Sequence, residues 1–282
     1  MRGAVNERRT EPPWVRRALT TVALAFFVLL LAMPLIFVVW SSLARGAAAW
    51  AAAVSRPDTA SAIRQTLTVV AWVVPLNTLF GVLAAYAITK FQFRGKAVLT
   101  ALIDLPFAIS PVIAGSIFVF LLGKFTPLGG WLESHGIKVI FSTPGMVLAT
   151  TFVTFPFVAR ELIPTMQAQG IEDELAARSL GASGWQSFWR VTVPNIRWSL
   201  LFGVVLCAAR AMGEFGAVSV VSAHVSGETN TLPLQVEALY SGLDVTSAFA
   251  VSSLLVLMAL LTLAVKAGVE WRYRRQEARE RA

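Results

Sequence analysis

The stretch ALTTVALAFFVLLLAMPLIFVVWSSLA, residues 18–44, contains no charged side chain. A helix needs about 20 mainly apolar residues to cross the hydrocarbon core of a bilayer, and this stretch is longer than that. It also exceeds the roughly 7–15 apolar residues of a signal peptide. We therefore predict an uncleaved first transmembrane helix that follows a basic segment, residues 1–17.

Five further stretches predict transmembrane helices of similar length. The composition agrees, because 56% of the residues are hydrophobic and only 14% are charged, whereas soluble chains average about 25% charged residues. We predict an all-α polytopic membrane protein with six transmembrane helices, one membrane domain over residues 18–271 and a basic tail, residues 272–282. The five further stretches are residues 65–89, 97–123, 139–159, 198–221 and 245–265.

The Lys and Arg residues are unevenly divided between the two sets of connections. The set that includes both termini holds 18 of them, with Arg160 counted there, and the other set holds five. Cytoplasmic connections carry the excess of positive charge, so we predict that both termini are cytoplasmic. The formal net charge of +8 fits these membrane flanks, and no nucleic-acid partner is expected.

The cysteine and histidine content gives no sign of a metal site. Cys207 is the single cysteine, which excludes an internal disulfide, and it lies in an apolar run typical of a buried thiol. His135 and His224 have no cysteine near them in the sequence. A structural zinc site is therefore not expected.

Two groups of residues are candidates for a polar route through the membrane. The stretch LPFAISPVIAG, residues 105–115, places Ser110 and Pro111 between apolar residues, where irregular backbone either shapes packing or lines a pathway. Arg210 and Glu214 are four residues apart, which predicts one helix face inside the fifth span. This pair either holds the bundle together or offers Arg210 to an anion.

A lone acidic residue in the third span has a simpler expectation. Asp104 is the only charged residue of the stretch 97–123. We expect it to cap a helix or to form an ion pair at a helix end.

The connection between the fourth and fifth spans, residues 161–197, is long and polar. Three acidic residues, 172–174, predict a helix N-terminus, and Gly181 is expected to end that helix. Ser183 is a plausible N-cap for a second helix, which Pro194 would close. That second helix would carry Trp185, Phe188 and Trp189 on one face, toward a partner protein or the lipid interface.

The segment LAARSLGASGWQSFWRVTVPN within this connection resembles the EAA loop of ABC importer permeases. Leu175 stands where the motif has Glu, with Glu174 one residue earlier, and Val191 and Val193 replace the motif's Ile and Leu. In that family the loop forms two coupling helices that sit in a groove of a separate ATP-hydrolysing subunit. The resemblance thus implies contact with that subunit for Glu174, Ala176, Ala177, Gly181, Trp185 and Phe188.

Four further stretches are informative: DLPFAISPVIAG, TFPFVARELIPTMQAQG, VPNIRWSLLFGVVLCAARAMGEFGAVSVVS and GETNTLPLQ. With them, most of the chain, about residues 61–271, resembles the sulfate/thiosulfate permeases, most closely the W-type subunit that pairs with a T-type subunit. The resemblance implies the type I ABC importer permease fold, an inner-membrane location and import of sulfate or thiosulfate. The implied partners are a second permease subunit, a dimer of ATP-binding subunits and a periplasmic or extracellular sulfate-binding protein. Molybdate and tungstate permeases share a segment like ARAMGEFGA, residues 208–216, so these oxyanions are the alternative substrates.

The energy source for such transport is not expected in this chain. Moving one negative charge inward against a negative-inside potential costs roughly 2.3 kcal/mol per 100 mV. A dianion therefore needs nearly twice that free energy. The Gly-Lys pairs at Gly95 and Gly123 lack the spacing of a P-loop, so the chain should hold no cofactor, and ATP and Mg should bind the partner ATPase. A stand-alone secondary transporter or channel, and then a membrane enzyme, are the alternatives from other classes.

Overall fold

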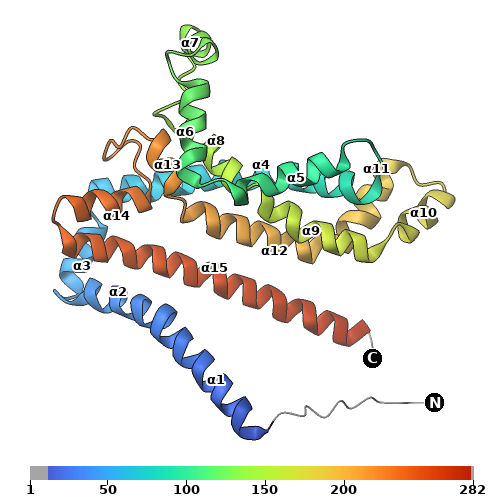
Figure 1. The fold of residues 1–282 in the computed structure, drawn as a ribbon, viewed down its shortest axis with the longest axis horizontal. Helices are drawn as coiled ribbons and strands as arrows, with labels where there is room; N and C mark the ends of the chain where they lie inside the picture. Colours follow the sequence, from blue (N-terminus) through green and yellow to red (C-terminus); the bar gives the residue numbers. More distant parts are fainter. Residues whose placement is uncertain (1–11, 281–282) are drawn as a thin grey trace.

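The computed structural model describes residues 12–280, and the regular elements in that range are all helical (Figure 1). Most of the basic N-terminal segment, residues 1–11, lies outside the described residues. In chain order the helices are α1 (Pro13–Phe27), η1 (Val28–Ala32), α2 (Met33–Leu43), α3 (Ala47–Val54), α4 (Pro57–Lys90), α5 (Lys96–Ala108), α6 (Pro111–Leu122), α7 (Pro127–Ser134), α8 (Thr143–Thr154), α9 (Pro156–Gln169), α10 (Glu172–Ser179), α11 (Gly184–Ser187), η2 (Phe188–Thr192), α12 (Val193–Met212), α13 (Gly216–Val221), α14 (Leu232–Ser241) and α15 (Val245–Glu280).

Five long helical segments of the described chain are apolar enough to cross a membrane, and the pair α5 and α6 makes a sixth if it counts as one span. This agrees with the six predicted spans, with three differences in detail. The fourth helical span covers residues 143–169, so the first residues of the predicted connection 161–197 belong to a helix. Helices α5 and α6 meet at an angle of 109°, so the third span is broken. The fifth helical span covers residues 184–212 and stops before Glu214, so the prediction that Glu214 lies inside a continuous span is wrong.

Two prolines explain the two π-helical turns. Pro34 is the second residue of α2, directly after η1, and Pro194 is the second residue of α12, directly after η2. A proline ring clashes with the carbonyl four residues earlier, and a π-helical turn widens the helix at that point. Pro194 was predicted to close one helix and to start the next span. It does stand at the start of α12, but it closes no helix, since the chain runs helically from η2 into α12.

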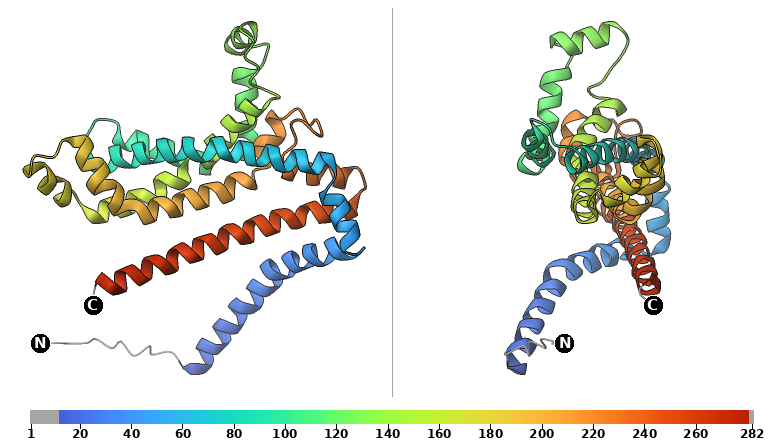
Figure 2. Two further views of the ribbon diagram at one scale, coloured as in Figure 1. Left: turned by 180° about the vertical axis from the view of Figure 1, so that it is seen from behind. Right: turned by 90° about the vertical axis from the view of Figure 1, so that its right-hand side faces the viewer.

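The chain ends differ in their packing. Helix α1 and the turn η1 have no buried residue in their apolar part, and α1 leans away from the bundle (Figures 1 and 2). Helix α2 packs on α15, where Phe37 and Phe249 meet edge to face at 5.8 Å. Helix α15 continues to Glu280, so residues 272–280 of the predicted basic tail extend the last helix, and residues 281–282 lie outside the described residues.

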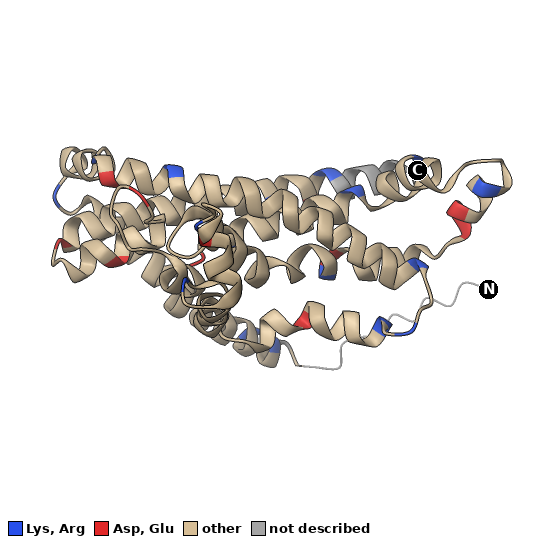
Figure 3. Cartoon of the chain, turned by 90° about the horizontal axis from the view of Figure 1, so that it is seen from above, with Lys and Arg blue, Asp and Glu red and all other residues tan. Residues whose placement is uncertain are grey.

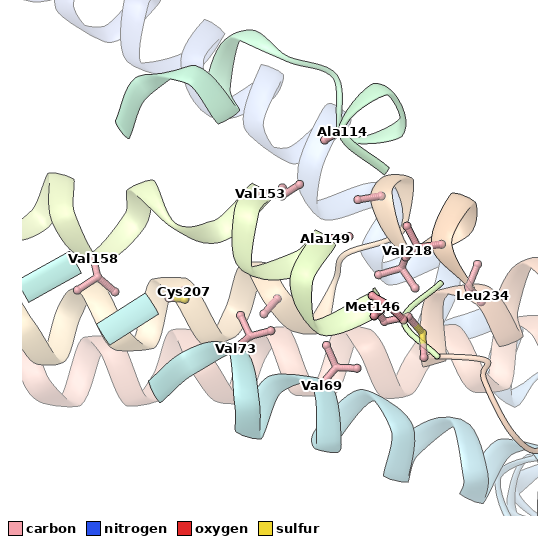
Figure 4. Packing of buried hydrophobic residues seen from close by; sticks show 14 of the residues in the cluster. Val69, Val73, Ala114, Met146, Ala149, Val153, Val158, Cys207, Val218 and Leu234 are labelled. Atoms are coloured by element: carbon pink, nitrogen blue, oxygen red, sulfur yellow. The ribbon is translucent and has the colours of Figure 1, made fainter. Parts of the chain in front are cut away.

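The core lies where α4, α8, α9 and α12 pack together, and Figure 4 shows its apolar side chains. Helix α9 fits between its neighbours because small residues face it: a Cβ at Gly81 of α4 would lie 2.7 Å from Val158, and one at Gly203 of α12 would lie 3.1 Å from the Val158 Cα atom. Such close backbone approach is typical of helix packing in membranes. A buried polar contact joins the same helices, since Asn77 donates to Thr154 at 2.7 Å.

Helices α6 and α7 form an arm that projects sideways from the bundle (Figures 1 and 2). The arm is anchored where α6 packs on α13, and a Cβ at Gly115 would lie 2.7 Å from the carbonyl oxygen of Ala217. The break between α5 and α6 therefore lies beside the short helix α13, which follows the end of α12.

Candidate functional site

The segment predicted to contact an ATPase forms two short helices, α10 and α11, at one end of the bundle (Figure 1). The three acidic residues 172–174 occupy the first turn of α10, as predicted. Ser183 caps α11 in a reciprocal arrangement with Gln186, so the predicted N-cap is also confirmed.

Gly181 gives the turn between these helices its shape. Its φ is +89°, a left-handed conformation that glycine adopts without steric cost, and a Cβ there would meet no atom within 4 Å. Ala177 and Gly181 line a shallow hollow together with Gln186 and Arg190, whereas Ala176 is exposed beside it. The small residues of the motif therefore leave an open surface around the turn.

The aromatic residues of α11 and η2 form one cluster at this surface. The rings of Trp185, Phe188 and Trp189 lie with centroids 5.3–6.2 Å apart. Phe188 also meets Tyr86 of α4 edge to face at 5.4 Å, whereas the side chains of Trp185 and Trp189 are exposed. Phe188 thus anchors the cluster to the bundle and leaves two tryptophans available for contact.

Glu174 points inward from α10. Its Oε1 lies 2.6 Å from Nζ of Lys90, at the end of α4, and accepts a hydrogen bond from Thr192 at 3.0 Å. Burial by itself raises the pKa of Glu174, but the hydrogen bonds from Lys90 and Thr192 outweigh it, so the net pKa lies below the ordinary value. Lys90 also donates to the carbonyl of Gly170 at 2.5 Å, so one lysine ties the start and the interior of this segment to α4.

The start of α13 lies against the joint between α5 and α6. Ser110 and Pro111 form the joint between α5 and α6, and a Cβ at Gly216 would lie 3.0 Å from the Cβ of Pro111. Glu214 stands in the break between α12 and α13, two residues before Gly216. Two helix breaks that are far apart in the sequence therefore lie beside one another.

Arg210 and Glu214 form the ion pair that their spacing suggested, but across a helix end. Arg210 Nη1 lies 2.7 Å from Glu214 Oε2, and Glu214 Oε1 accepts from the backbone N–H of Ala217 at 2.9 Å. The Glu214 side chain is 1% exposed and that of Arg210 is 35% exposed. Glu214 therefore holds the corner between α12 and α13 and has little surface of its own.

A second charged pair within the membrane helices was not predicted. Arg160 lies inside α9 and not in a polar connection, so counting it among the cytoplasmic residues was wrong. Its Nη2 lies 2.7 Å from Oδ1 of Asp104, which stands within α5 and not at a helix end. Arg160 directly follows the apolar stretch 139–159, and that position was the only sequence signal for it.

The described residues contain no group of three or more His, Cys, Asp or Glu side chains that could hold a metal ion. Cys207 is buried and accepts a hydrogen bond from Asn77 at 3.5 Å, as expected for a thiol that packs in the core.

Comparison with known proteins decides the family. Residues 77–277 match the model described as binding-protein-dependent transport system inner membrane component. The chain belongs to this family. It is 46% identical to the sulfate transport system permease protein CysW of Escherichia coli (strain K12), over 94% of this chain and 91% of that protein. It is 33% identical to the sulfate transport system permease protein CysT of the same strain, over 92% and 93%.

A solved structure shows the same fold. It is a bacterial alginate ABC transporter in complex with an alginate pentasaccharide-bound periplasmic protein, and one chain matches with a TM-score of 0.76 over 93% of this chain and 94% of that one. The identity is 19%, so the likeness concerns the fold. The predicted type I ABC importer permease fold is confirmed, and the permease is a multi-pass integral membrane protein.

Proposed function

We propose that this chain is a membrane-spanning subunit of an ATP-driven importer for sulfate and thiosulfate in the inner membrane. The observation that carries the proposal is the 46% identity with a sulfate transport system permease over nearly the whole chain. Two intramembrane arginines add a physical reason, because a dianion needs positive charge along its route. Molybdate and tungstate remain the alternative substrates.

The proposed complex contains a second permease subunit of the T type, two ATP-binding subunits and a periplasmic or extracellular sulfate-binding protein. The likeness to CysT as well as CysW supports a pair of related permeases. The match with a transporter solved together with its periplasmic protein supports a binding-protein partner. In this proposal ATP and Mg bind the ATPase subunits, and this chain acts as a permease and not as an enzyme.

Helices α10 and α11 are the proposed contact with the ATPase. The exposed Trp185 and Trp189 offer aromatic anchors, and large exposed aromatic side chains often dominate protein interfaces. The Lys90–Glu174 pair would pass a movement of α10 to the long helix α4, since it joins the two directly. Trp185→Ala should weaken ATPase binding and leave the permease assembled.

The orientation follows from charge and is testable by labelling. We place both termini and α10 in the cytoplasm and α7 outside, because the positive charges gather on the terminal side. Figure 3 shows where the Lys and Arg residues of the described chain lie. Cysteines at Ser134 and at Leu180, which is 90% exposed, are suitable probes in a Cys207→Ala background. On intact cells an impermeant thiol reagent should label Ser134→Cys only, and the reverse pattern would contradict this orientation.

The function is tested by reconstitution. The chain, its second permease and the ATPase are placed in proteoliposomes, and the uptake of radioactive sulfate is measured with the binding protein present. We expect uptake that requires ATP and is reduced by excess thiosulfate. Uptake without ATPase subunits would indicate a secondary transporter or channel, and competition by molybdate or tungstate alone would change the substrate.

A further inference from the structure

The charged pair between α5 and α9 is unusual in its position. Nε of Arg160 donates to Oδ1 of Asp104 at 2.8 Å, and Nη2 lies 2.7 Å from the same oxygen. Arg160 lies nine residues before Gln169, the end of α9. At 1.5 Å per residue this is about 14 Å from the helix end, inside the candidate span of residues 143–169.

The pair is exposed on the surface of this chain. The side chains of Arg160 and Asp104 are 54% and 43% exposed, whereas Glu214 of the other intramembrane pair is 1% exposed. Charge that faces lipid inside a span is costly, so we expect this surface to face water or another protein. Further polar groups continue it along α9, because Glu161 is partly exposed and Thr165 hydrogen-bonds with Ser199 of α12 at 2.7 Å.

Aromatic rings hold the guanidinium in place. The Cζ atom of Arg160 lies 4.8 Å from the centroid of the Phe107 ring, and Phe107 meets Phe157 edge to face at 5.6 Å. The guanidinium therefore keeps its orientation through the ring as well as through the carboxylate. Within the described part of the chain, its Nη1 has no hydrogen-bond acceptor.

We propose that Arg160 is a binding station for a divalent tetrahedral oxyanion, and that Asp104 is the internal counter-ion that occupies Arg160 when no anion is bound. A carboxylate oxygen and an oxyanion oxygen accept hydrogen bonds from the same N–H donors. A dianion attracts the guanidinium more strongly than a singly charged carboxylate does. Exposed ion pairs contribute little to stability, so exchange of Asp104 for the anion is easy. This inference rests on the proposed function and assigns a residue to its substrate.

The Arg210 pair is less suited to such exchange. Glu214 is buried and also accepts a backbone N–H of α13, so releasing Arg210 would leave a buried carboxylate without its charge partner. Asp104, by contrast, remains hydrated when the anion takes its place. A weak and reversible site is also what a transport pathway needs, because the anion has to leave.

A cysteine experiment tests the proposal in the assembled complex. Arg160→Cys, in a Cys207→Ala background, is treated with 2-aminoethyl methanethiosulfonate, which restores a positive charge, or with neutral methyl methanethiosulfonate. We expect Arg160→Cys to reduce sulfate uptake at least tenfold, the cationic reagent to recover part of it, and the neutral reagent to recover none. Gln167→Cys, on an exposed position of the same helix, is the matched control whose uptake should not change.

Two further readouts do not depend on activity alone. Sulfate should slow the reaction of the thiol in an Asp104→Cys variant, in which Arg160 is intact, with the cationic reagent, measured by intact mass of this chain. Asp104→Asn should retain uptake and lower the sulfate concentration that gives half-maximal uptake severalfold, because the competing carboxylate is gone. Both results would support an anion station.

Three outcomes would overturn the proposal. The first is restored uptake in the charge-swapped variant Arg160→Asp with Asp104→Arg, which would show a structural pair. The second is an Arg160→Cys thiol that reacts in the isolated chain but with neither reagent in the complex, which would place the pair under a partner subunit. The third is unchanged uptake in Arg160→Cys. Failure of the proposed function looks different, since the wild-type complex would then show no ATP-dependent sulfate uptake.

Discussion

The two intramembrane ion pairs of this permease have the same chemistry and opposite surroundings. Arg210 and Glu214 are four residues apart, and their carboxylate is buried and shared with the backbone of α13. Asp104 and Arg160 are 56 residues apart, join two different helices and are about half exposed. The burial of Glu214 favours a permanent ion pair with Arg210, whereas the exposure of Asp104 allows Arg160 to exchange it for another anion.

The difference teaches that charge inside a membrane helix has more than one use. A buried carboxylate that has lost its partner carries the full cost of desolvation, so its pair stabilises the fold only as a unit. An exposed pair loses little when it opens, because solvent replaces the partner. The following substitutions test this contrast, from the largest expected effect to the smallest.

The largest effect is expected at the α12–α13 corner. Arg210→Gln leaves the buried Glu214 without its cation and should destabilise the complex by about 3–5 kcal/mol, with little permease in the membrane. The double variant Arg210→Gln with Glu214→Gln should recover most of the assembled protein. The measurement is the amount of assembled complex, together with uptake per complex. If the double variant also transports normally, Arg210 has no contact with the anion, and full assembly of Arg210→Gln alone would refute the structural role.

The loss of stability on breaking the Lys90–Glu174 pair should lie between the losses for the two intramembrane pairs. Its side chains are 7% and 13% exposed, so Lys90→Met should cost about 1–3 kcal/mol by leaving Glu174 and Gly170 unsatisfied. We expect faster hydrogen exchange in α10 and weaker coupling of ATP hydrolysis to uptake. Arg178→Met, on the exposed side of α10, is the control. Equal rates of hydrogen exchange in α10 in both variants would argue against a role of the Lys90–Glu174 pair in holding α10 on α4.

The same pair has a defined pH dependence. The pKa of Glu174 is lowered in the folded protein, so its stabilising contribution is complete above the ordinary value of 4.5 and is lost as the pH falls through the lower native value. Hydrogen exchange of α10 in the wild type should therefore accelerate only in acid below pH 4.5, after correction for intrinsic rates. Glu174→Gln should remove this acceleration of hydrogen exchange. If the acceleration persists in the variant, it belongs to another titrating group.

A smaller effect on folding is expected at Gly181, which has no internal partner. Gly181→Ala forces a side chain into the left-handed region at a cost of about 1–2 kcal/mol, whereas Gly181→Asn tolerates that conformation better. We expect assembly of both variants and a greater loss of uptake for alanine. Gly184→Ala, inside α11, serves as the control. Gly181→Asp should assemble and yet abolish uptake, and normal coupling in all variants would contradict contact with the ATPase.

The smallest effect on stability is expected for Asp104→Asn. The carboxylate is exposed, so its loss should change the stability of the complex by less than about 1 kcal/mol, visible as a minor shift in melting temperature. Asp104→Asn and Arg210→Gln should therefore lie at opposite ends of the same stability scale. A large loss of melting temperature in Asp104→Asn would remove the contrast between the two pairs.

Local composition and spacing were sufficient for much of this protein. Apolar runs of more than 20 residues have few solutions in a bilayer other than helices, so the spans were predictable. The acidic first turn of α10, the Ser183 cap and the glycine turn were predictable for the same reason, since each depends on neighbours within a few residues. The ion pair of Arg210 and Glu214 was also suggested by local spacing, although not the helix end between them.

Contacts between distant segments were decided only by the tertiary structure. No spacing rule relates Asp104 to Arg160 or Lys90 to Glu174, because these pairs form when separate helices pack. The continuous helix through Pro194 depends on a π-helical turn, which neighbouring packing must favour over a simple break. Burial likewise belongs to the assembled bundle, and burial is what separates a charge that holds the fold from a charge that can meet an anion.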